Sequence, residues 1–400
     1  MMKPENERQS RLMLLPPFLR AGFRPFFFGG ALWALIVVSL WVLAMSGMIR
    51  IPTYFDPLAW HRHEMLFGYL GAVVAGFLLT AIPNWTGRLP ISGARLAALA
   101  GLWLAGRLAI LFSAVVGAPV AAALDIGFLA TLALVAAREV LAAKNRNFPI
   151  VTAAGLFAIA DAVDHGEALG GPIPAGLGWR MGFALVLMMV ALIGGRIIPS
   201  FTRNWLAKQA YQGRLPTQPN RFDLAAILAT GLSLIAWIAA PDARSSGALL
   251  LVAGLAQFVR LARWAGLRTI RDPLVFILHL SYVWLPFGLM LLGASSFVAA
   301  IPASSAIHAL GAGAMASMTL AVMTRATLGH TGRDLRADGL TQAIYLLVTA
   351  GAIVRFMAPM LPFDYQHAIE LAGGLWGSAF LLFLLAYAPR LLGPRPDGRP

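Results

Sequence analysis

Apolar residues run in long stretches along almost the whole chain, separated by short connections that are rich in arginine. A helix needs about 20 mainly apolar residues to cross the hydrocarbon core of a bilayer, and the chain meets that length twelve times. We therefore predict an all-α, polytopic protein that forms a single transmembrane domain over residues 1–400. The predicted spans are 26–48, 63–85, 93–113, 117–138, 149–169, 176–199, 222–240, 246–264, 273–294, 303–328, 340–358 and 368–388.

The distribution of charged residues predicts how the spans are oriented across the membrane. Lys and Arg concentrate in alternate connections, on the side that holds both ends of the chain, which predicts cytoplasmic termini by the positive-inside rule. The first 25 residues are too charged and too interrupted by proline for a signal peptide, so we expect them to stay attached in the cytoplasm. The fifth span is the weakest. It carries Asp161, Asp164, His165 and Glu167.

Composition narrows the chemistry. The chain is 59% hydrophobic and 12% charged, which excludes a soluble domain. It has no cysteine, so a thiolate metal site, an iron–sulfur cluster and covalent haem attachment are all excluded. The net charge of +14 is spread between the spans instead of forming one basic face, and we expect no nucleic-acid partner. The lipid bilayer is the predicted environment.

A repeat relates the second, sixth and tenth spans. When His63 is laid over Trp179 and His308, a threonine follows 23 residues later in all three. Spans that match four apart predict three four-helix units around a pseudo-threefold axis. Chance similarity between helices rich in glycine, alanine and leucine is the alternative.

His63 and His308 are the leading metal ligands, because they occupy equivalent positions of this repeat. Two imidazoles from facing helices can hold a haem iron, here a non-covalent b-type haem. The alternative is that each histidine only makes a hydrogen bond at the membrane interface. His61 lies two residues before His63, so on a helix it faces another neighbour and shares a face with Met65. A His/Met pair is acceptable to copper.

Further polar residues near the same helices have several possible roles. Glu64 is our candidate catalytic residue, as a carboxylate that orients a histidine or relays protons; it can also simply cap the helix start. Arg196 and Arg325 share one position of the repeat and can hold haem propionates or a substrate anion, or extend to the lipid headgroups. His279 and His330, with Arg196, form a possible inner polar site.

Four long motifs resemble the NnrS family of bacterial membrane proteins. They are WHRHEMLFGYLGAVVAGFLLTAIPNWTGR (60–88), GGRIIPSFTRNW (194–205), HLSYVWLP (279–286) and HALGAGAMASMTLAVMTRATLGHTGR (308–333). The resemblance covers nearly the whole chain. It implies a twelve-span protein with haem and copper that helps denitrifying or host-exposed bacteria tolerate nitric oxide. The motif histidines that carry over are His61, His63, His279, His308 and His330. His165 and His367 lie outside the motifs and receive no role.

The twelve spans are also similar in architecture to the catalytic subunit of haem–copper oxidases and nitric oxide reductases. That family places copper-binding histidines on its sixth and seventh helices, where this chain has none. Any second metal must therefore be held differently, and the same redox mechanism is in doubt.

Taken together, the resemblance implies a haem- and copper-containing protein of the bacterial inner membrane. It would bind or reduce nitric oxide or a derived species, take electrons from an unknown donor and protect against nitrosative stress. Whether it is an enzyme of the oxidoreductase class is left open. The main alternative is a transporter or metal-handling protein that uses the histidines as transient ligands, and a third is an assembly or sensing partner of respiratory enzymes.

Overall fold

A computed structural model describes residues 12–145 and 147–399, and within them it contains helices and no strand. Twelve helices in this part of the chain are long and apolar enough to cross a membrane, which confirms the predicted count. Residues 1–11 of the predicted cytoplasmic segment lie outside the described residues. The elements that form the spans are α2 (Phe23–Met45), α3 (Pro57–His63), η2 (Glu64–Leu70), α4 (Gly71–Thr86), α5 (Ala94–Leu111), α7 (Ala118–Ala142), α8 (Phe148–Ala168), α9 (Leu177–Lys208), α10 (Arg221–Ala239), α11 (Arg244–Ala262), α12 (Pro273–Ser295), α13 (Ala303–His308), η4 (Ala309–Met315), α14 (Ala316–His330), α15 (Gly339–Met357), η5 (Ala358–Met360) and α16 (Tyr365–Leu392). The remaining short helices are η1 (Pro17–Leu19), α6 (Ser113–Val116) and η3 (Gly266–Thr269).

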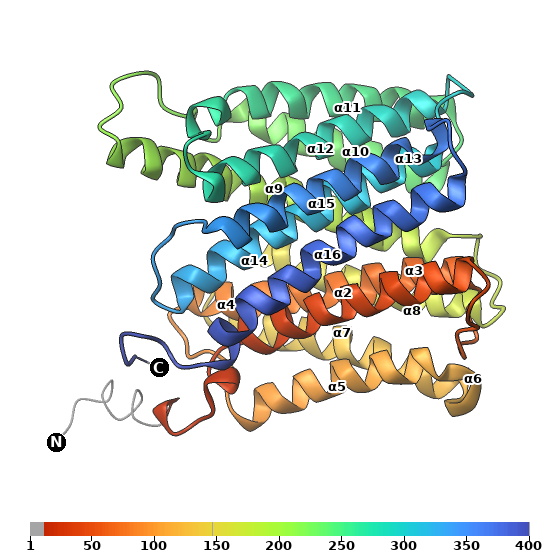
Figure 1. Ribbon diagram of the computed structural model, residues 1–400, viewed down its shortest axis with the longest axis horizontal. Helices are drawn as coiled ribbons and strands as arrows, with labels where there is room; N and C mark the ends of the chain where they lie inside the picture. The colour runs from red at the N-terminus through yellow and green to blue at the C-terminus, as the bar shows by residue number, and fades with distance from the viewer. Residues whose placement is uncertain (1–11, 146, 400) are drawn as a thin grey trace. The chain divides into compact units, whose positions relative to one another are not determined.

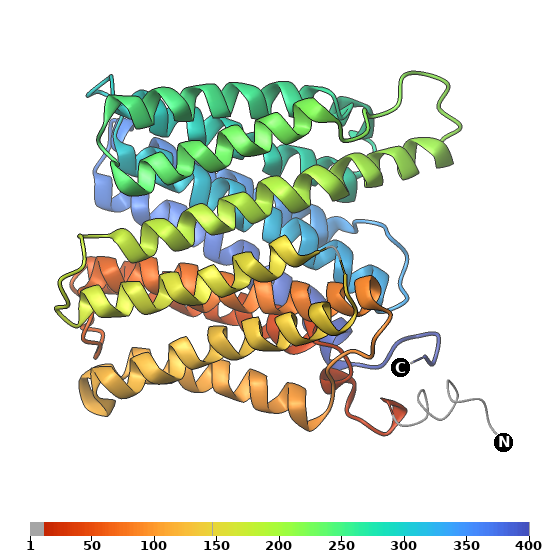
Figure 2. The ribbon, with the colours of Figure 1, turned by 180° about the vertical axis from the view of Figure 1, so that it is seen from behind.

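Contacts divide the chain into two compact units, and the expected single domain stays a prediction. The first unit holds residues 1–182, 326–334 and 383–400. Within it α5 packs against α7, α7 against α8, and α2 against α3, η2 and α4. Figure 1 shows α5 and α7 side by side, and Figure 2 shows α7 and α8 from behind.

The second unit holds residues 183–325 and 335–382. Within it α11 packs against α10 and α12, while η4 packs against α12 and α15. A buried polar network ties three of these helices together. Arg260 Nε donates to Asp223 Oδ1 at 3.0 Å, and Arg260 Nη1 donates to Tyr282 Oη at 3.0 Å. Gly195 is required beside it, because a Cβ there would overlap the Arg260 guanidinium.

The second span begins six residues earlier than the apolar pattern predicts. Asp56 caps α3: its side chain accepts hydrogen bonds from the backbone N–H groups of Leu58 and Ala59, and Pro57 occupies the first helical position. His61 and His63 are therefore both helical and face different neighbours.

Both histidines of the predicted haem pair stand at the same kind of backbone transition. His63 ends α3 and is followed by the seven-residue π-helix η2, while His308 ends α13 and is followed by the seven-residue π-helix η4. π-helical turns are rare and concentrate at functional positions. This supports the equivalence of the second and tenth spans. The pseudo-threefold arrangement stays a prediction.

Candidate metal centre

Helix α8 carries three of the polar side chains that make the centre. Asp161, Asp164 and His165 are spaced i, i+3 and i+4, so they share one face of the helix. All three are buried, although Asp164 keeps 9% of its surface exposed. Ionisable residues inside a membrane span are costly and mark functional sites by default.

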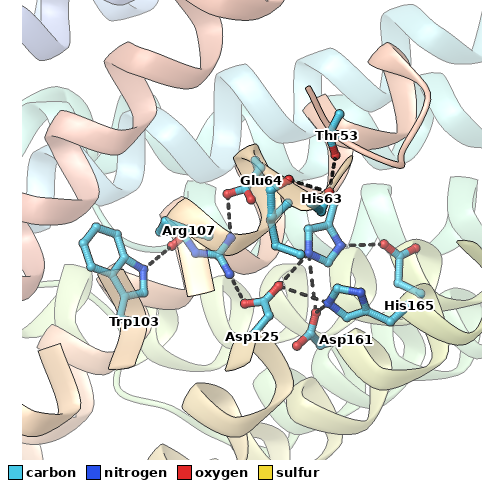
Figure 3. Close-up of polar contacts among 12 residues, drawn as sticks. Thr53, His63, Glu64, Trp103, Arg107, Asp125, Asp161 and His165 are labelled. Carbon is cyan, nitrogen blue, oxygen red and sulfur yellow. Dashed lines mark hydrogen bonds and ion pairs between the residues drawn. The ribbon is translucent and has the colours of Figure 1, made fainter. Parts of the chain in front are cut away.

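The end of α3 and the middle of α7 complete the cluster. His63 and Asp125 are both fully buried, and Figure 3 shows their side chains pointing toward Asp161 and His165. One potential ligand atom from each of the four residues lies within 4.8 Å of all the others. We call His63, Asp125, Asp161 and His165 the metal-site cluster.

The two histidines present the same ring nitrogen to the carboxylates. His63 Nε2 lies 2.7 Å from Asp125 Oδ2, and His165 Nε2 lies 3.1 Å from the same oxygen. The two Nε2 atoms lie 3.8 and 3.7 Å from Asp161 Oδ1. Those last distances are too long for hydrogen bonds, and among the described residues neither oxygen of the buried Asp161 has a hydrogen-bond partner.

The opposite nitrogen of each imidazole is held by its own partner. His63 Nδ1 lies 2.8 Å from Asp164 Oδ2, and His165 Nδ1 lies 2.6 Å from the hydroxyl of Tyr54. Burial, with the nearby carboxylates of Asp161 and Asp164, raises the pKa of Tyr54 well above its ordinary value, so the phenol is neutral at physiological pH. Metal-ligating histidines are oriented by contacts of this kind.

Further buried side chains hold the Asp125 oxygen that does not face His63. Arg107 is fully buried on α5 and forms ion pairs with Asp125 and with Glu64, the latter at 2.5 Å. Trp33 Nε1 donates to the same Glu64 oxygen at 2.5 Å. Gly68 leaves room for this pair, because a Cβ there would collide with Glu64 Oε2 and lie 2.6 Å from Arg107 Nη1.

The centre holds more negative than positive formal charge. Glu64, Asp125, Asp161 and Asp164 bring four carboxylates, whereas Arg107 is the one arginine in ion-pair contact with them in the described part of the chain. Buried carboxylates are stable only when paired, protonated or bound to a cation. A divalent ion would offset most of the excess.

A cavity of about 260 Å³ adjoins the centre. Its lining includes Tyr54, Asp164 and Glu167 together with Arg62 and Trp179. Asp164 and Tyr54 therefore face the cavity on one side and the two histidines on the other. The cavity gives a small ion or molecule a polar approach to the cluster.

A comparison with protein families decides the relationship of the chain. The family model described as NnrS protein matches residues 17–395. The chain belongs to the NnrS family. No curated protein matches it at a significant level.

The structure places the predicted residues of this NnrS protein in different surroundings. His63 lies in the metal-site cluster with both ring nitrogens facing carboxylates. His61 instead stacks on Trp41, with ring centroids 4.2 Å apart. Met65 is half-buried. The copper pair of His61 and Met65 stays a prediction.

Glu64 does not cap the helix, and that interpretation is wrong because Asp56 occupies the capping position. Its carboxylate accepts from Trp33 and Arg107 instead. Glu64 therefore supports Asp125 through Arg107. A catalytic role for Glu64 stays a prediction.

The remaining predicted ligands of the NnrS chain are spread over both units. His308 is half-buried, and its Nδ1 donates to the Ser304 carbonyl at 2.7 Å, which leaves Nε2 as the nitrogen with the lone pair. His279 Nε2 lies 2.7 Å from the hydroxyl of Thr202, while its buried Nδ1 has no hydrogen-bond partner in the described part of the chain. His330 is exposed and lines a second cavity.

The two arginines expected to hold an anion also differ. Arg325 is half-buried and lies over the ring of Phe201, 4.2 Å from its centroid. Arg196 is exposed on α9. Their proposed contact with haem propionates stays a prediction, as does the inner polar site of His279, His330 and Arg196.

Sequence reasoning missed Asp125, Asp161 and His165 as members of the site. The sequence does carry a signal for this site. Asp161, Asp164 and His165 lower the hydropathy of the fifth span and share one face of its helix. Arg107 and Asp125 were lone charges inside two other apolar spans. Isolated ionisable groups in neighbouring spans are expected to pair.

Proposed function

We propose that this chain is a membrane metalloprotein of the nitric oxide response, whose metal-site cluster holds one divalent transition-metal ion. Membership of the NnrS family supports the role in the nitric oxide response. The four buried donors of the cluster support the metal. The proposal includes the bacterial inner membrane and cytoplasmic termini, which the distribution of Lys and Arg supports.

One observation carries the metal proposal. Asp161 Oδ1 stands 3.7 to 3.8 Å from two imidazole nitrogens and makes no hydrogen bond. Ligands that share one ion at bond lengths of about 2.0–2.2 Å lie roughly 3.0–3.8 Å apart. A hydrogen-bonded salt bridge would instead draw these atoms together to about 2.8 Å. The spacing thus favours an ion between Asp161 and the histidines.

The surroundings fit the same interpretation. Asp164 and the hydroxyl oxygen of Tyr54 can each accept a hydrogen bond from the Nδ1–H of a ligating histidine, which would leave both Nε2 lone pairs directed at the ion. Arg107 holds the other oxygen of Asp125 and thereby aims its Oδ2 inward. Each proposed metal ligand except Asp161 would then be held by a further side chain that does not touch the ion.

The donor set restricts the metal. Two imidazoles with two carboxylates suit Cu(II), Fe(II) and Zn(II), whereas thiolate-seeking ions have no ligand in a chain without cysteine. Copper is the ion that the family resemblance implies. A copper or iron ion held by His63, Asp125, Asp161 and His165 would supply a centre able to react with nitric oxide, and the adjoining cavity would give access to it.

Haem stays a second, separate prediction. His308 fits an axial ligand, since its Nδ1 hydrogen bond leaves Nε2 available. His63 would have to leave both Asp125 and Asp164 before either ring nitrogen reached a haem iron. We therefore assign His63 to the metal-site cluster in this proposal.

The deciding experiment measures metal in the purified full chain. Iron, copper and zinc are quantified in the unaltered protein, in His165→Ala, and in the control His367→Ala, whose side chain is 76% exposed. We expect about one ion per chain in the unaltered protein and the control, and loss of that ion in His165→Ala. Equal metal content in all three would refute the site.

Two further measurements on the same samples test the role. Addition of nitric oxide to the reduced protein should change the absorption or paramagnetic resonance spectrum of the bound metal, and His165→Ala should lose that change. Metal flux across vesicles, with the bound ion exchanging rapidly, would favour the transporter alternative instead.

A further inference from the structure

A second cavity of the first unit has the opposite electrostatic character. It measures about 290 Å³ and lies where α2 begins and α4 ends, at the other end of the second span from Tyr54. Its polar lining consists of Arg20, Arg24, Arg395, His330, Thr80 and Asn84, and no carboxylate is among its lining residues.

Neutral carbonyl groups hold two of these arginines in place. Arg24 is only 2% exposed, and its Nη1 donates to the carbonyls of Leu391 and Gly393 at 2.8 and 2.7 Å. Arg20 donates from Nε to the Leu15 carbonyl at 3.0 Å and from Nη2 to the Met13 carbonyl at 2.9 Å. These contacts orient the guanidinium groups without neutralising them.

Positive charge is therefore concentrated around the cavity. Arg20, Arg333 and Arg395 all lie near enough to repel the buried Arg24. Asp397 pairs with Arg395, and this hydrogen bond lowers the pKa of Asp397 to about 2. In the described residues no carboxylate lies within ion-pair distance of Arg20 or Arg24. Within the described residues, Arg395 therefore has a carboxylate partner, whereas Arg20 and Arg24 are held by carbonyl oxygens alone.

We propose that this cavity binds a phosphate oxyanion, held by the guanidinium groups of Arg20 and Arg24, and that Arg395 joins them by exchanging its Asp397 partner for the phosphate. Guanidinium groups suit phosphate because their planar donors match two of its oxygens. The cavity exceeds the size of one phosphate group and leaves room for a small substituent, while Phe23 and Leu79 supply apolar lining. The same phosphate chemistry is offered by an anionic phospholipid headgroup and by a free phosphate-bearing solute.

Position also favours this assignment. The cavity adjoins the first residue of α2 and the last turn of α4, so it lies at the level where a span leaves the hydrocarbon. The arginine at that level is Arg24, which is buried and donates to the carbonyls of Leu391 and Gly393. Its guanidinium group is therefore held inside the protein and does not extend toward the lipid headgroups. The site is independent of the metal-site cluster and shares no residue with it.

The test measures binding to the purified full chain in a non-ionic detergent. The probes are inorganic phosphate, short-chain phosphatidylglycerol and short-chain phosphatidylcholine, and the readouts are a dissociation constant and the shift in thermal midpoint. Arg20→Gln and Arg395→Gln are compared with Arg50→Gln, an exposed arginine after the end of α2. Two cavity variants keep the test valid if one fails to fold.

We expect phosphate or phosphatidylglycerol to bind and phosphatidylcholine to bind less. Each cavity variant should weaken binding roughly tenfold, as expected for loss of a hydrogen bond to a charged group, while Arg50→Gln should not. Binding of phosphatidylglycerol alone assigns the site to a lipid, and binding of phosphate with no further gain from the lipid assigns it to a solute. Unchanged binding in both cavity variants, or no binding to the unaltered chain, would overturn the proposal.

Discussion

His63 and His165 direct their Nε2 atoms at one and the same oxygen, Asp125 Oδ2, from 2.7 and 3.1 Å. The two rings come from different helices and meet edge to face, with centroids 4.6 Å apart. Each ring is held from behind by its own partner, Asp164 or Tyr54. Two independently oriented imidazoles that converge on a shared point have the geometry that the proposed metal site requires.

Asp161→Asn should have opposite effects with and without metal. The change removes a proposed ligand, so metal affinity should fall by more than the roughly 10–100-fold that loss of an outer partner costs. After treatment with a chelator, the variant should be more stable than the unaltered protein by about 1–3 kcal/mol, because a buried carboxylate without a hydrogen-bond partner has been neutralised. Thermal unfolding with and without the chelator measures both effects.

An unaltered metal content in Asp161→Asn would contradict the ligand assignment. A destabilised metal-free variant would contradict the view that the Asp161 carboxylate is uncompensated without the ion. Asp364→Asn is the matched control, because its side chain is 61% exposed.

Asp164→Asn should weaken metal binding without abolishing it. Asp164 touches only the outer nitrogen of His63, at 2.8 Å, and loss of such a partner typically costs 10–100-fold in affinity. A titration of the metal-free protein measures the change. His165→Ala provides the reference for full loss, and an Asp164 variant as empty as that reference would make Asp164 a direct ligand.

Gly68→Ala should destabilise the first unit by about 1–3 kcal/mol, the cost of overpacking a buried site. The new methyl group would collide with Glu64 and Arg107, which cannot move without disturbing Asp125. Gly127→Ala on α7 is the control, because its methyl group would meet nothing within 4 Å. The control should gain up to about 1 kcal/mol from helix propensity. Thermal unfolding in detergent separates the two, and equal effects would show that Glu64 and Arg107 are loosely held.

Haem and the cluster metal should respond to different histidines. If His308 holds a haem, His308→Ala should remove the Soret absorption and keep the cluster ion, whereas His165→Ala should keep the Soret absorption and lose the ion. His63→Ala distinguishes the two predictions made for that residue. Loss of the ion alone supports the cluster, and loss of haem would restore the axial pair expected from the repeat.

Much of the fold could be predicted from the chain alone, because the bilayer demands long apolar helices and each of the twelve runs is a local feature. The bounds were less certain. The second span starts early since Asp56 and Pro57 cap it, and a hydropathy count does not register a cap. The equivalence of His63 and His308 was visible as a sequence repeat and reappears in their backbone.

The metal-site cluster was harder to predict, because its members are distant in the chain. His63 meets partners 62 and 101 residues away, and only the packing of α3, α7 and α8 brings them together. The family motifs do not include His165, although its span carries the acids Asp161, Asp164 and Glu167. In a membrane span, polar residues that weaken the hydropathy signal are themselves the evidence for a site.

The π-helix η2 resets the phase of the second span. A π-helical turn holds more residues than the 3.6 of an α-helix, and each additional residue rotates everything that follows by about 100°. The side chains of α4, which begins at Gly71, are therefore rotated about the helix axis relative to the positions expected from the histidine-bearing α3. If the apolar face of the second span is projected from Pro57 with 3.6 residues per turn, it therefore points in the wrong direction beyond Leu70. In the tenth span, which contains η4, the same projection fails beyond Met315.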